Sequence, residues 1–195
     1  KKILIKVKYN VPGNIKNKTN FFSFHSFSDT VFMNLDGGNN KMFEIFFFVN
    51  PIGINCYQNE QEIIAAVSGY NQNISYHFIP MTTMNTIRND IKARHLSLNN
   101  VEVFNTFSQS AYNATKDYHT LKLIVGNKKA RQYIINLQHA INDMNKTYSP
   151  ELVIEILDSL NVSIKSFKKN RESNYIKLSM DKDLKLVYDL NVVTT

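Results

Sequence analysis

The run Phe43–Tyr57, FEIFFFVNPIGINCY, most constrains how this chain can fold. Its first part is a continuous stretch of aromatic and β-branched residues, which is typical of a strand covered on both faces in a parallel sheet. Asn50-Pro51 ends that stretch, and apolar residues then recur at helical spacing through Tyr57–Tyr70. The run therefore predicts a strand, a tight loop and a helix, with Cys56 in the first turn of the helix.

A second strand and two long helices follow. Ile74–Pro80 is rich in β-branched and aromatic residues, so the first part of the chain predicts a β-α-β unit with a parallel strand pair and a right-handed crossover. Apolar residues three or four apart then predict a helix over Phe104–Val125 that ends at Gly126, and another over Ala130–Met144.

Two more helices are predicted in the last third of the chain. Ser149 and Pro150 have the residue types of an N-cap and a first helical position. Ser173–Asn191 has one apolar face and predicts a helix that returns to the β-α-β unit. The order of elements is therefore a β-α-β unit followed by a block of helices that extends to the end of the chain.

Length and composition agree with such an organisation. With 195 residues, 43% of them hydrophobic, the chain can bury the core of one domain, with or without an insertion. No run approaches the roughly 18 apolar residues that span a bilayer, so we expect no membrane segment. The single cysteine excludes an intramolecular disulfide and is compatible with a reducing compartment.

The net charge of +7 raises the question of nucleic-acid binding. Residues 1–41 hold seven lysines against two acids, whereas residues 42–195 hold sixteen basic against fourteen acidic residues, a balance of only +2. Because the chain shows no basic stripe interleaved with stacking aromatic residues, we expect no nucleic-acid partner.

Residues 1–41 have no clear helical period and hold most of the net charge. The codons of the segment ending at Met42 can include a ribosome-binding sequence shortly before an ATG, so we expect Met42 to be the native start. In that case residues 1–41 would be an upstream or disordered segment that the domain does not need. The alternative is an extra N-terminal strand.

The loop and helix start carry a resemblance to a known family. A helix N-terminus stabilises a thiolate, and thioredoxin-like proteins place a P-x-C-x-x-C motif there. Pro51, Gly53 and Cys56 fit that frame, although glycine replaces the first cysteine. The segment FFFVNPIGINC resembles the DsbA-like branch of the thioredoxin superfamily, and within it the SpxH (YjbH) adapter group of low-G+C Gram-positive bacteria.

This resemblance implies a fold and its boundaries. The fold class is α/β, a thioredoxin-like fold with an inserted helical domain, and with the C-terminal strands missing. Residues 42–82 would form the first half of the thioredoxin-like part, 83–170 the inserted helical domain, and 171–195 the returning helix. By the same resemblance, Val193, Thr194 and Thr195 would approach a cis-proline loop that faces the motif.

The resemblance also implies which chemistry remains. Thiol-disulfide exchange needs an attacking thiolate and a second thiol, and Gly53 removes the first of them. Cys56 is then either a small buried hydrophobic residue or a monothiol redox site. The candidate site also includes the motif-loop residues Pro51, Ile52, Ile54 and Asn55.

Other site chemistries find no support in the residues. The five histidines form no spacing typical of zinc ligands, and we expect His77 to be a structural residue near the sheet. The chain has no phosphate-binding glycine loop and no nucleophile elbow, so we expect neither a cofactor nor a metal.

Two functions remain, from different classes. By resemblance, the first is a cytoplasmic adapter that binds the transcription regulator Spx and promotes its degradation by the ClpXP protease. The second is a DsbA-like thiol-disulfide oxidoreductase or isomerase, or a monothiol redox protein. Cysteine-free relatives such as kappa transferases use a serine at the active helix start, and Gly53 cannot supply that hydroxyl. The incomplete motif favours the non-enzymatic function.

Overall fold

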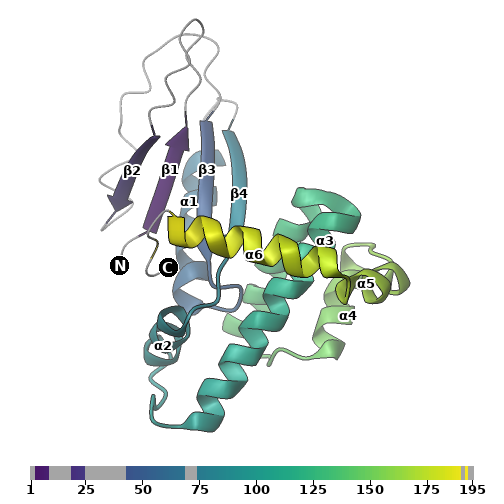
Figure 1. The fold of residues 1–195 in the computed structure, drawn as a ribbon. Coiled ribbons are helices and arrows are strands. Elements are labelled where there is room, and N and C mark those ends of the chain that lie inside the picture. Colours follow the sequence, from purple (N-terminus) through teal and green to yellow (C-terminus); the bar gives the residue numbers. More distant parts are fainter. Residues whose placement is uncertain (1–2, 9–18, 25–42, 69–73, 190–191, 193–195) are drawn as a thin grey trace, which may run out of the picture.

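The structure is a computed structural model of the chain, and it describes residues 3–8, 19–24, 43–68, 74–189 and 192. Its sheet has the strand order β2-β1-β3-β4, and the helices gather mainly at one end of this sheet (Figure 1). The strands are β1 (Ile3–Lys8), β2 (Thr19–Phe24), β3 (Phe43–Val49) and β4 (Ile74–Pro80).

The β-α-β unit predicted from the sequence is confirmed. β3 and β4 pair in parallel, in a register that runs from Phe43 opposite Ile74 to Val49 opposite Pro80. Helix α1 (Ile54–Ser68) connects them, so Cys56 does lie in the first turn of a helix. Val49 and Phe78 are each 3% exposed, as expected for strands covered by other elements.

β1 and β2 form an antiparallel hairpin beside β3. The register between β1 and β3 consists of two residue pairs, Val7 with Ile45 and Lys8 with Glu44. The sequence left open whether residues 1–41 lie upstream of the domain or add a strand to it. The drawn arrangement corresponds to the added strand, and the boundary at residue 42 stays a prediction.

Five further helices follow β4. They are α2 (Met84–Ala93), α3 (Val101–Asn142), α4 (Pro150–Ser159), α5 (Ile164–Arg171) and α6 (Asn174–Asp189). The break predicted at Gly126 is confirmed, because this residue has φ 83° and ψ 173° within α3 and separates two helical segments. Ser149 caps α4 as predicted, since its side chain accepts a hydrogen bond from the Leu152 amide at 3.2 Å.

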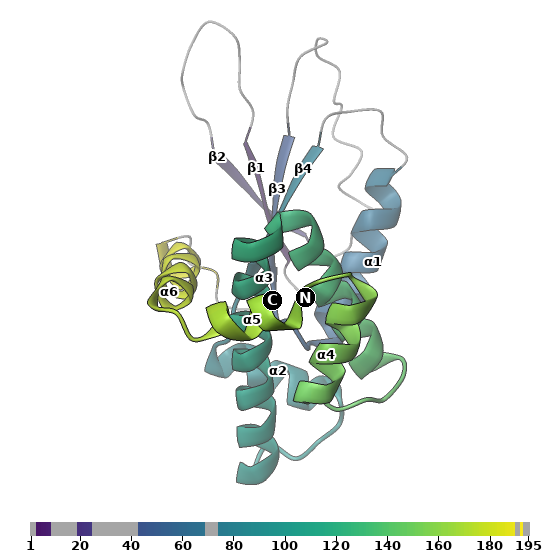
Figure 2. The ribbon, with the colours of Figure 1, turned by 90° about the vertical axis from the view of Figure 1, so that its right-hand side faces the viewer.

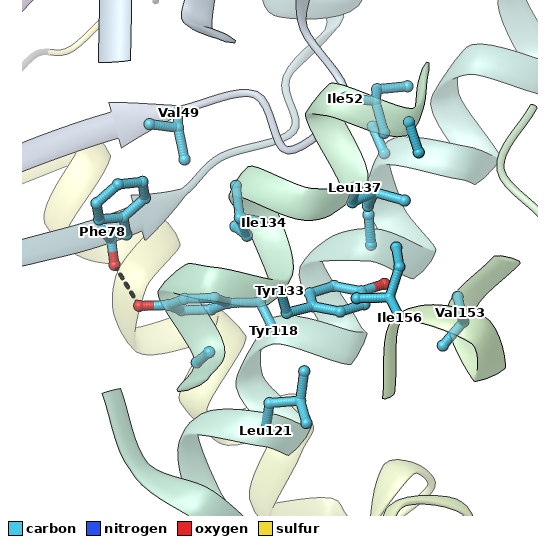
Figure 3. Packing of buried hydrophobic residues seen from close by; sticks show 14 of the residues in the cluster. Val49, Ile52, Phe78, Tyr118, Leu121, Tyr133, Ile134, Leu137, Val153 and Ile156 are labelled. Atoms are coloured by element: carbon cyan, nitrogen blue, oxygen red, sulfur yellow. Dashed lines mark hydrogen bonds between the residues drawn. The ribbon is translucent and has the colours of Figure 1, made fainter. Parts of the chain in front are cut away.

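The main core lies where the two segments of α3 pack on α4 and on the ends of β3 and β4. Tyr118, Tyr133 and Leu137 are each at most 1% exposed. The Tyr118 hydroxyl donates to the Phe78 carbonyl at 2.9 Å and so joins α3 to β4 (Figure 3). Because this contact satisfies polar atoms inside the core, it fixes the helical part against the sheet.

Helix α6 is held to α3 by a buried polar contact. His119 Nδ1 lies 2.8 Å from the Ser179 hydroxyl, and His119 Nε2 lies 3.6 Å from Asp183. Burial lowers the pKa of His119 to about 3, so the imidazole is neutral near pH 7 and this contact is not an ion pair. Across the described part of the chain, no helix is long and apolar enough to span a membrane.

Candidate functional site

The structure brings the sequence-predicted loop residues together at the carboxyl end of β3. The Gly53 amide donates to the Asn50 carbonyl at 3.0 Å, and the Tyr57 amide donates to the Gly53 carbonyl at 3.1 Å. These bonds close the turn between β3 and α1. Pro51, Ile52 and Gly53 are buried, whereas Ile54 and Asn55 are half-buried. We call residues 50–56 the motif loop.

Cys56 lies on the inner side of the motif loop. Its Sγ accepts a hydrogen bond from the Asn50 amide at 3.3 Å, and the residue is 7% exposed. Thiol-disulfide exchange requires an attacking sulfur in line with the disulfide of its substrate, so it depends on access. In this arrangement Cys56 is in contact with the backbone of its own loop and presents little surface to a substrate.

Gly53, where the sequence resemblance predicts a missing nucleophile, has no room for a side chain. A Cβ atom placed there would lie 2.9 Å from Asn50 Cβ and 3.2 Å from Asn50 Cγ. Asn50 Cβ cannot move away by a change of rotamer, so any side chain at position 53 requires a backbone shift. The packing of the loop therefore fits the glycine found at position 53 and would not accommodate a cysteine there without a backbone shift.

A carboxylate and a guanidinium from α2 hold the outer side of the motif loop. Asp90 Oδ1 accepts from the Ile54 amide at 3.0 Å, and Arg94 Nη2 donates to the Ile52 carbonyl at 2.7 Å. Arg94 Nε also donates to Asp90 Oδ2 at 3.1 Å. We call this pair the Asp90–Arg94 bridge.

The Asp90–Arg94 bridge places a buried carboxyl group beside the backbone amides at the start of α1. Asp90 is 4% exposed, and burial raises its pKa although Arg94 and the Ile54 amide act in the opposite direction. An amide at a helix N-terminus can bind an external anion, but here the Ile54 amide already has an internal carboxylate as its acceptor. Sequence reasoning missed both residues, and their i, i+4 spacing was the one available signal.

Two buried polar side chains, Gln138 and Glu60, lie beneath the motif loop. Gln138 Nε2 donates to the Asn50 carbonyl at 3.3 Å and to Glu60 Oε1 at 3.2 Å. Glu60 is four residues after Cys56 on α1, so the two share one face of the helix. Burial raises the pKa of Glu60 to about 8, with the hydrogen bond from Gln138 opposing the shift. A carboxyl group that keeps its proton at neutral pH thus lies one helical turn from the thiol.

The exposed rim of the site connects α1 to the end of α3. The Tyr57 hydroxyl donates to Asp143 Oδ2 at 2.6 Å, and His139 Nδ1 lies 2.6 Å from the same oxygen. The hydrogen bond to Asp143 raises the pKa of Tyr57 to about 12. Tyr57 therefore stays protonated at neutral pH and cannot replace the absent nucleophile.

Two other predicted features have different outcomes. Val193, Thr194 and Thr195, which the sequence places near a cis-proline loop, lie outside the described residues. Within the described residues, no group of histidine, cysteine and acidic side chains could hold a metal ion. His77 is half-buried on β4 beside the core.

Comparisons with known proteins place the fold. The sequence profile of the family described as Thioredoxin matches residues 46–195. A search of curated proteins gives no match.

Several solved structures have a similar fold. A putative protein disulfide isomerase from Nitrosomonas europaea has a TM-score of 0.58 at 12% identity, over 76% of this chain and 79% of that one. The thiol-disulfide exchange protein alpha-DsbA2 from Wolbachia pipientis has a TM-score of 0.51 at 16% identity, over 78% and 67%. The cytosolic disulfide reductase DsbM from Pseudomonas aeruginosa, solved with GSH, has a TM-score of 0.52 at 12% identity, over 77% and 82%. The predicted fold class is thereby confirmed as thioredoxin-like and DsbA-like, with a helical domain.

The packing around Gly53 generates a stability prediction. We expect Gly53→Ala to lower the free energy of unfolding by about 1–3 kcal/mol, because its Cβ would overlap Asn50 Cβ. Combining it with Asn50→Gly, which removes that Cβ, should give a total loss smaller than the sum of the two single losses by about 1 kcal/mol. Urea unfolding of the four proteins of this cycle measures the coupling. Strict additivity would show that Asn50 does not close the position.

The buried carboxyl of Glu60 generates a pH prediction. Its pKa is about 8 in the folded chain against an ordinary value of 4.5, so the folded state binds more protons between these values and loses stability as pH rises through them. Glu60→Gln should therefore leave stability nearly unchanged near pH 4.5 and raise it by on the order of 3 kcal/mol near pH 8. Urea unfolding from pH 4.5 to 8.5 tests this. Glu62→Gln, an exposed change on the same helix, is the control and should show no such trend.

Proposed function

We propose, starting from the fact that the chain belongs to the thioredoxin family, that it is a protein-binding adapter in which the redox motif has become structural. The partners proposed from the sequence resemblance are the transcription regulator Spx and the ClpXP protease, which gives the protein a cytoplasmic location. The solved structures with this fold support the scaffold, and the chemistry of the motif loop supports the change of function.

The observation that carries this proposal is the closed packing at position 53. Asn50 leaves no space for the nucleophile that a dithiol cycle requires. Cys56, the remaining thiol of the motif, is 7% exposed and accepts a hydrogen bond from the Asn50 amide. A catalytic dithiol needs the opposite arrangement, with an accessible thiolate next to a resolving thiol.

The outer surface next to the motif loop suits a protein partner. The segment from α2 to the start of α3 begins just after β4 and includes the Asp90–Arg94 bridge. It also carries four exposed large apolar side chains, and apolar side chains that lie together on a surface mark sites of protein interaction. They are Met84 (58% exposed), Leu96 (42%), Leu98 (47%) and Val101 (71%).

Adapter action requires no bond to be made or broken. A protein that holds a substrate beside a protease raises the effective concentration of that substrate, so degradation becomes faster without new chemistry. What the fold must supply is a rigid surface. The Asp90–Arg94 bridge and the buried Gln138 contacts hold the motif loop in one conformation and so provide it.

We expect the protein to accelerate ClpXP degradation of Spx from the same organism, and Cys56→Ser to keep most of that acceleration because the thiol takes no part. The measurement is the rate of Spx loss with and without adapter, for wild type and Cys56→Ser, with an unrelated ClpXP substrate as control. Absence of acceleration at micromolar adapter would exclude this function. Loss of acceleration in Cys56→Ser would make the cysteine a control point.

The second candidate is a thiol-disulfide oxidoreductase or monothiol redox protein. It is favoured by the position of Cys56 in the first turn of α1, where its sulfur accepts a backbone hydrogen bond. Two of the structural neighbours are described as a putative protein disulfide isomerase and a cytosolic disulfide reductase. Here the Cys56 thiolate would attack a disulfide sulfur and expel the other sulfur as a thiolate, and release would need an added thiol.

Insulin reduction with glutathione as thiol donor separates the two candidates. We expect the rate to equal that of glutathione alone, because Cys56 is shielded and has no resolving thiol in this single-cysteine chain. Turnover above background that disappears in Cys56→Ser would establish the enzymatic candidate.

A further inference from the structure

A second polar centre lies away from the motif loop, in the helical part of the chain. A hollow of about 790 Å³ lies between α3, α4 and α5, whose arrangement is shown in Figure 2, and no residue of the motif loop lines it. The chemistry of the motif loop does not involve this hollow.

One wall is a row of side-chain amides on α3. Asn105, Gln109 and Asn113 line the hollow at intervals of four residues, so their side chains follow one another along one face of the helix. The helix rise gives a repeat of about 6 Å. Two residues of an extended peptide repeat every 6.6 Å or so. The amides of Asn105 and Gln109 can both donate and accept, whereas Asn113 Oδ1 already accepts from Arg171 Nη2 at 3.3 Å and its Nδ2 can donate. Such a row can bond the backbone of every second residue of an extended chain.

The opposite wall is apolar. It is formed by Val153 and Ile154 of α4 together with Ile164 and Phe167 of α5. Phe167 and Val153 are 4% and 5% exposed, so their positions are fixed by the core, and Ile154 and Ile164 are half-buried. An extended peptide whose backbone faces α3 would place alternate side chains against this wall.

At the end of the hollow, the negative charge of Asp117 is compensated by neighbouring groups, and Lys168 contributes a positive charge. Asp117 is buried there, but Arg171 Nε lies 2.6 Å from one of its oxygens, and the hydroxyls of Tyr133 and Tyr148 donate to the other at 2.8 Å and 2.5 Å. The Asp117 carboxylate is thus fully bonded. Lys168 also lines the hollow, and among the described residues the ion pairs of α5 are those of Arg171 with Asp117 and Glu172. The surplus charge is positive.

Helix α5 strengthens that positive charge. Its sequence, IKSFKKNR, holds four basic residues and no acid. An acidic ligand would therefore be attracted to this end of the hollow, while basic ligands would be repelled. The amide row extends about 12 Å from Asn105 to Asn113, which is longer than a single carboxylate or phosphate needs.

We propose that the hollow between α3, α4 and α5 binds an extended peptide segment in which apolar residues alternate with acidic ones. Its backbone bonds the amides of Asn105, Gln109 and Asn113, its apolar side chains lie on the α4 and α5 wall, and its acidic side chains lie near Lys168. This inference deepens the proposed binding function, on which it rests, by naming the surface and the chemistry of the segment that it takes.

Fluorescence anisotropy with the full chain tests the site directly. The probe is a fluorescein-labelled peptide of about six residues in which Leu and Asp alternate, long enough to cover the amide row. The reference peptide has Lys in place of Asp. We expect the acidic peptide to bind at least about tenfold more tightly, since charge complementarity favours it at this end of the hollow.

Matched variants locate the peptide. Lys168→Glu should weaken binding about tenfold, whereas Lys169→Glu, the same charge change on the same helix but outside the hollow, should have a much smaller effect. Gln109→Ala should weaken binding about three- to tenfold through lost hydrogen bonds. Gln132→Ala, also exposed on α3 but outside the hollow, should leave it unchanged.

The proposal would be overturned if the peptide did not bind at millimolar concentration, or if Lys168→Glu and Lys169→Glu weakened peptide binding equally. It would also be overturned if inorganic phosphate displaced the peptide and Gln109→Ala had no effect on peptide binding. The last would identify a simple anion site. Neither Spx nor protease is present in this assay. If the peptide fails to bind but Spx degradation is still accelerated, the peptide site in the hollow is rejected and the adapter function stands. If the peptide binds but Spx degradation is not accelerated, the adapter function is rejected and the peptide site stands.

Discussion

The contact on which the site depends is the Asp90–Arg94 bridge. The Arg94 guanidinium joins three separate parts of the chain, because it bonds the Ile52 carbonyl of the motif loop, Asp90 of its own helix and the Asn142 side chain at the end of α3. Its side chain is 16% exposed and that of Asp90 is 3% exposed, so neither group can exchange these partners for water freely. Removing either partner would leave the other charge buried and uncompensated, which costs far more than a surface ion pair contributes.

The same bridge explains why a helix start of this kind need not be reactive. The first turn of a helix attracts anions through unpaired amides, and thiolate chemistry in this fold uses that field. In this chain the Ile54 amide bonds Asp90 Oδ1, and the Asn50 amide bonds Cys56 Sγ. The neighbouring side chain Glu60 carries a proton near pH 7, because burial raises its pKa to about 8. The Ile54 amide, the Cys56 sulfur and the Glu60 carboxyl therefore each have a hydrogen-bond partner inside the protein.

The sequence predicted the elements that have a periodic apolar pattern or a capping residue within a few positions. β3, β4 and the break at Gly126 follow from apolar runs and from glycine at a helix end, and the Ser149 cap follows from its own neighbours. It did not predict the Asp90–Arg94 bridge or the contact of Gln138 with Glu60. Asp90 and Arg94 are only four residues apart, but their bonds to the motif loop, Ile54 to Asp90 and Arg94 to Ile52, join residues 36 and 42 positions apart. The bonds of Gln138 to Glu60 and Asn50 join residues 78 and 88 positions apart. Such long-range contacts leave no periodic signal.

Losing exchange chemistry at one end of such a fold does not weaken its capacity to bind, because the two properties rest on different contacts. The closed position at Gly53 depends on Asn50, at the start of the motif loop. The hollow beside Lys168 lies where α4 and α5 pack on α3, and there the hydroxyls of Tyr133 and Tyr148 donate to Asp117. Contacts without shared partners contribute nearly independently to stability. The motif loop could therefore lose its nucleophile while the helical part kept, or gained, a surface for another protein.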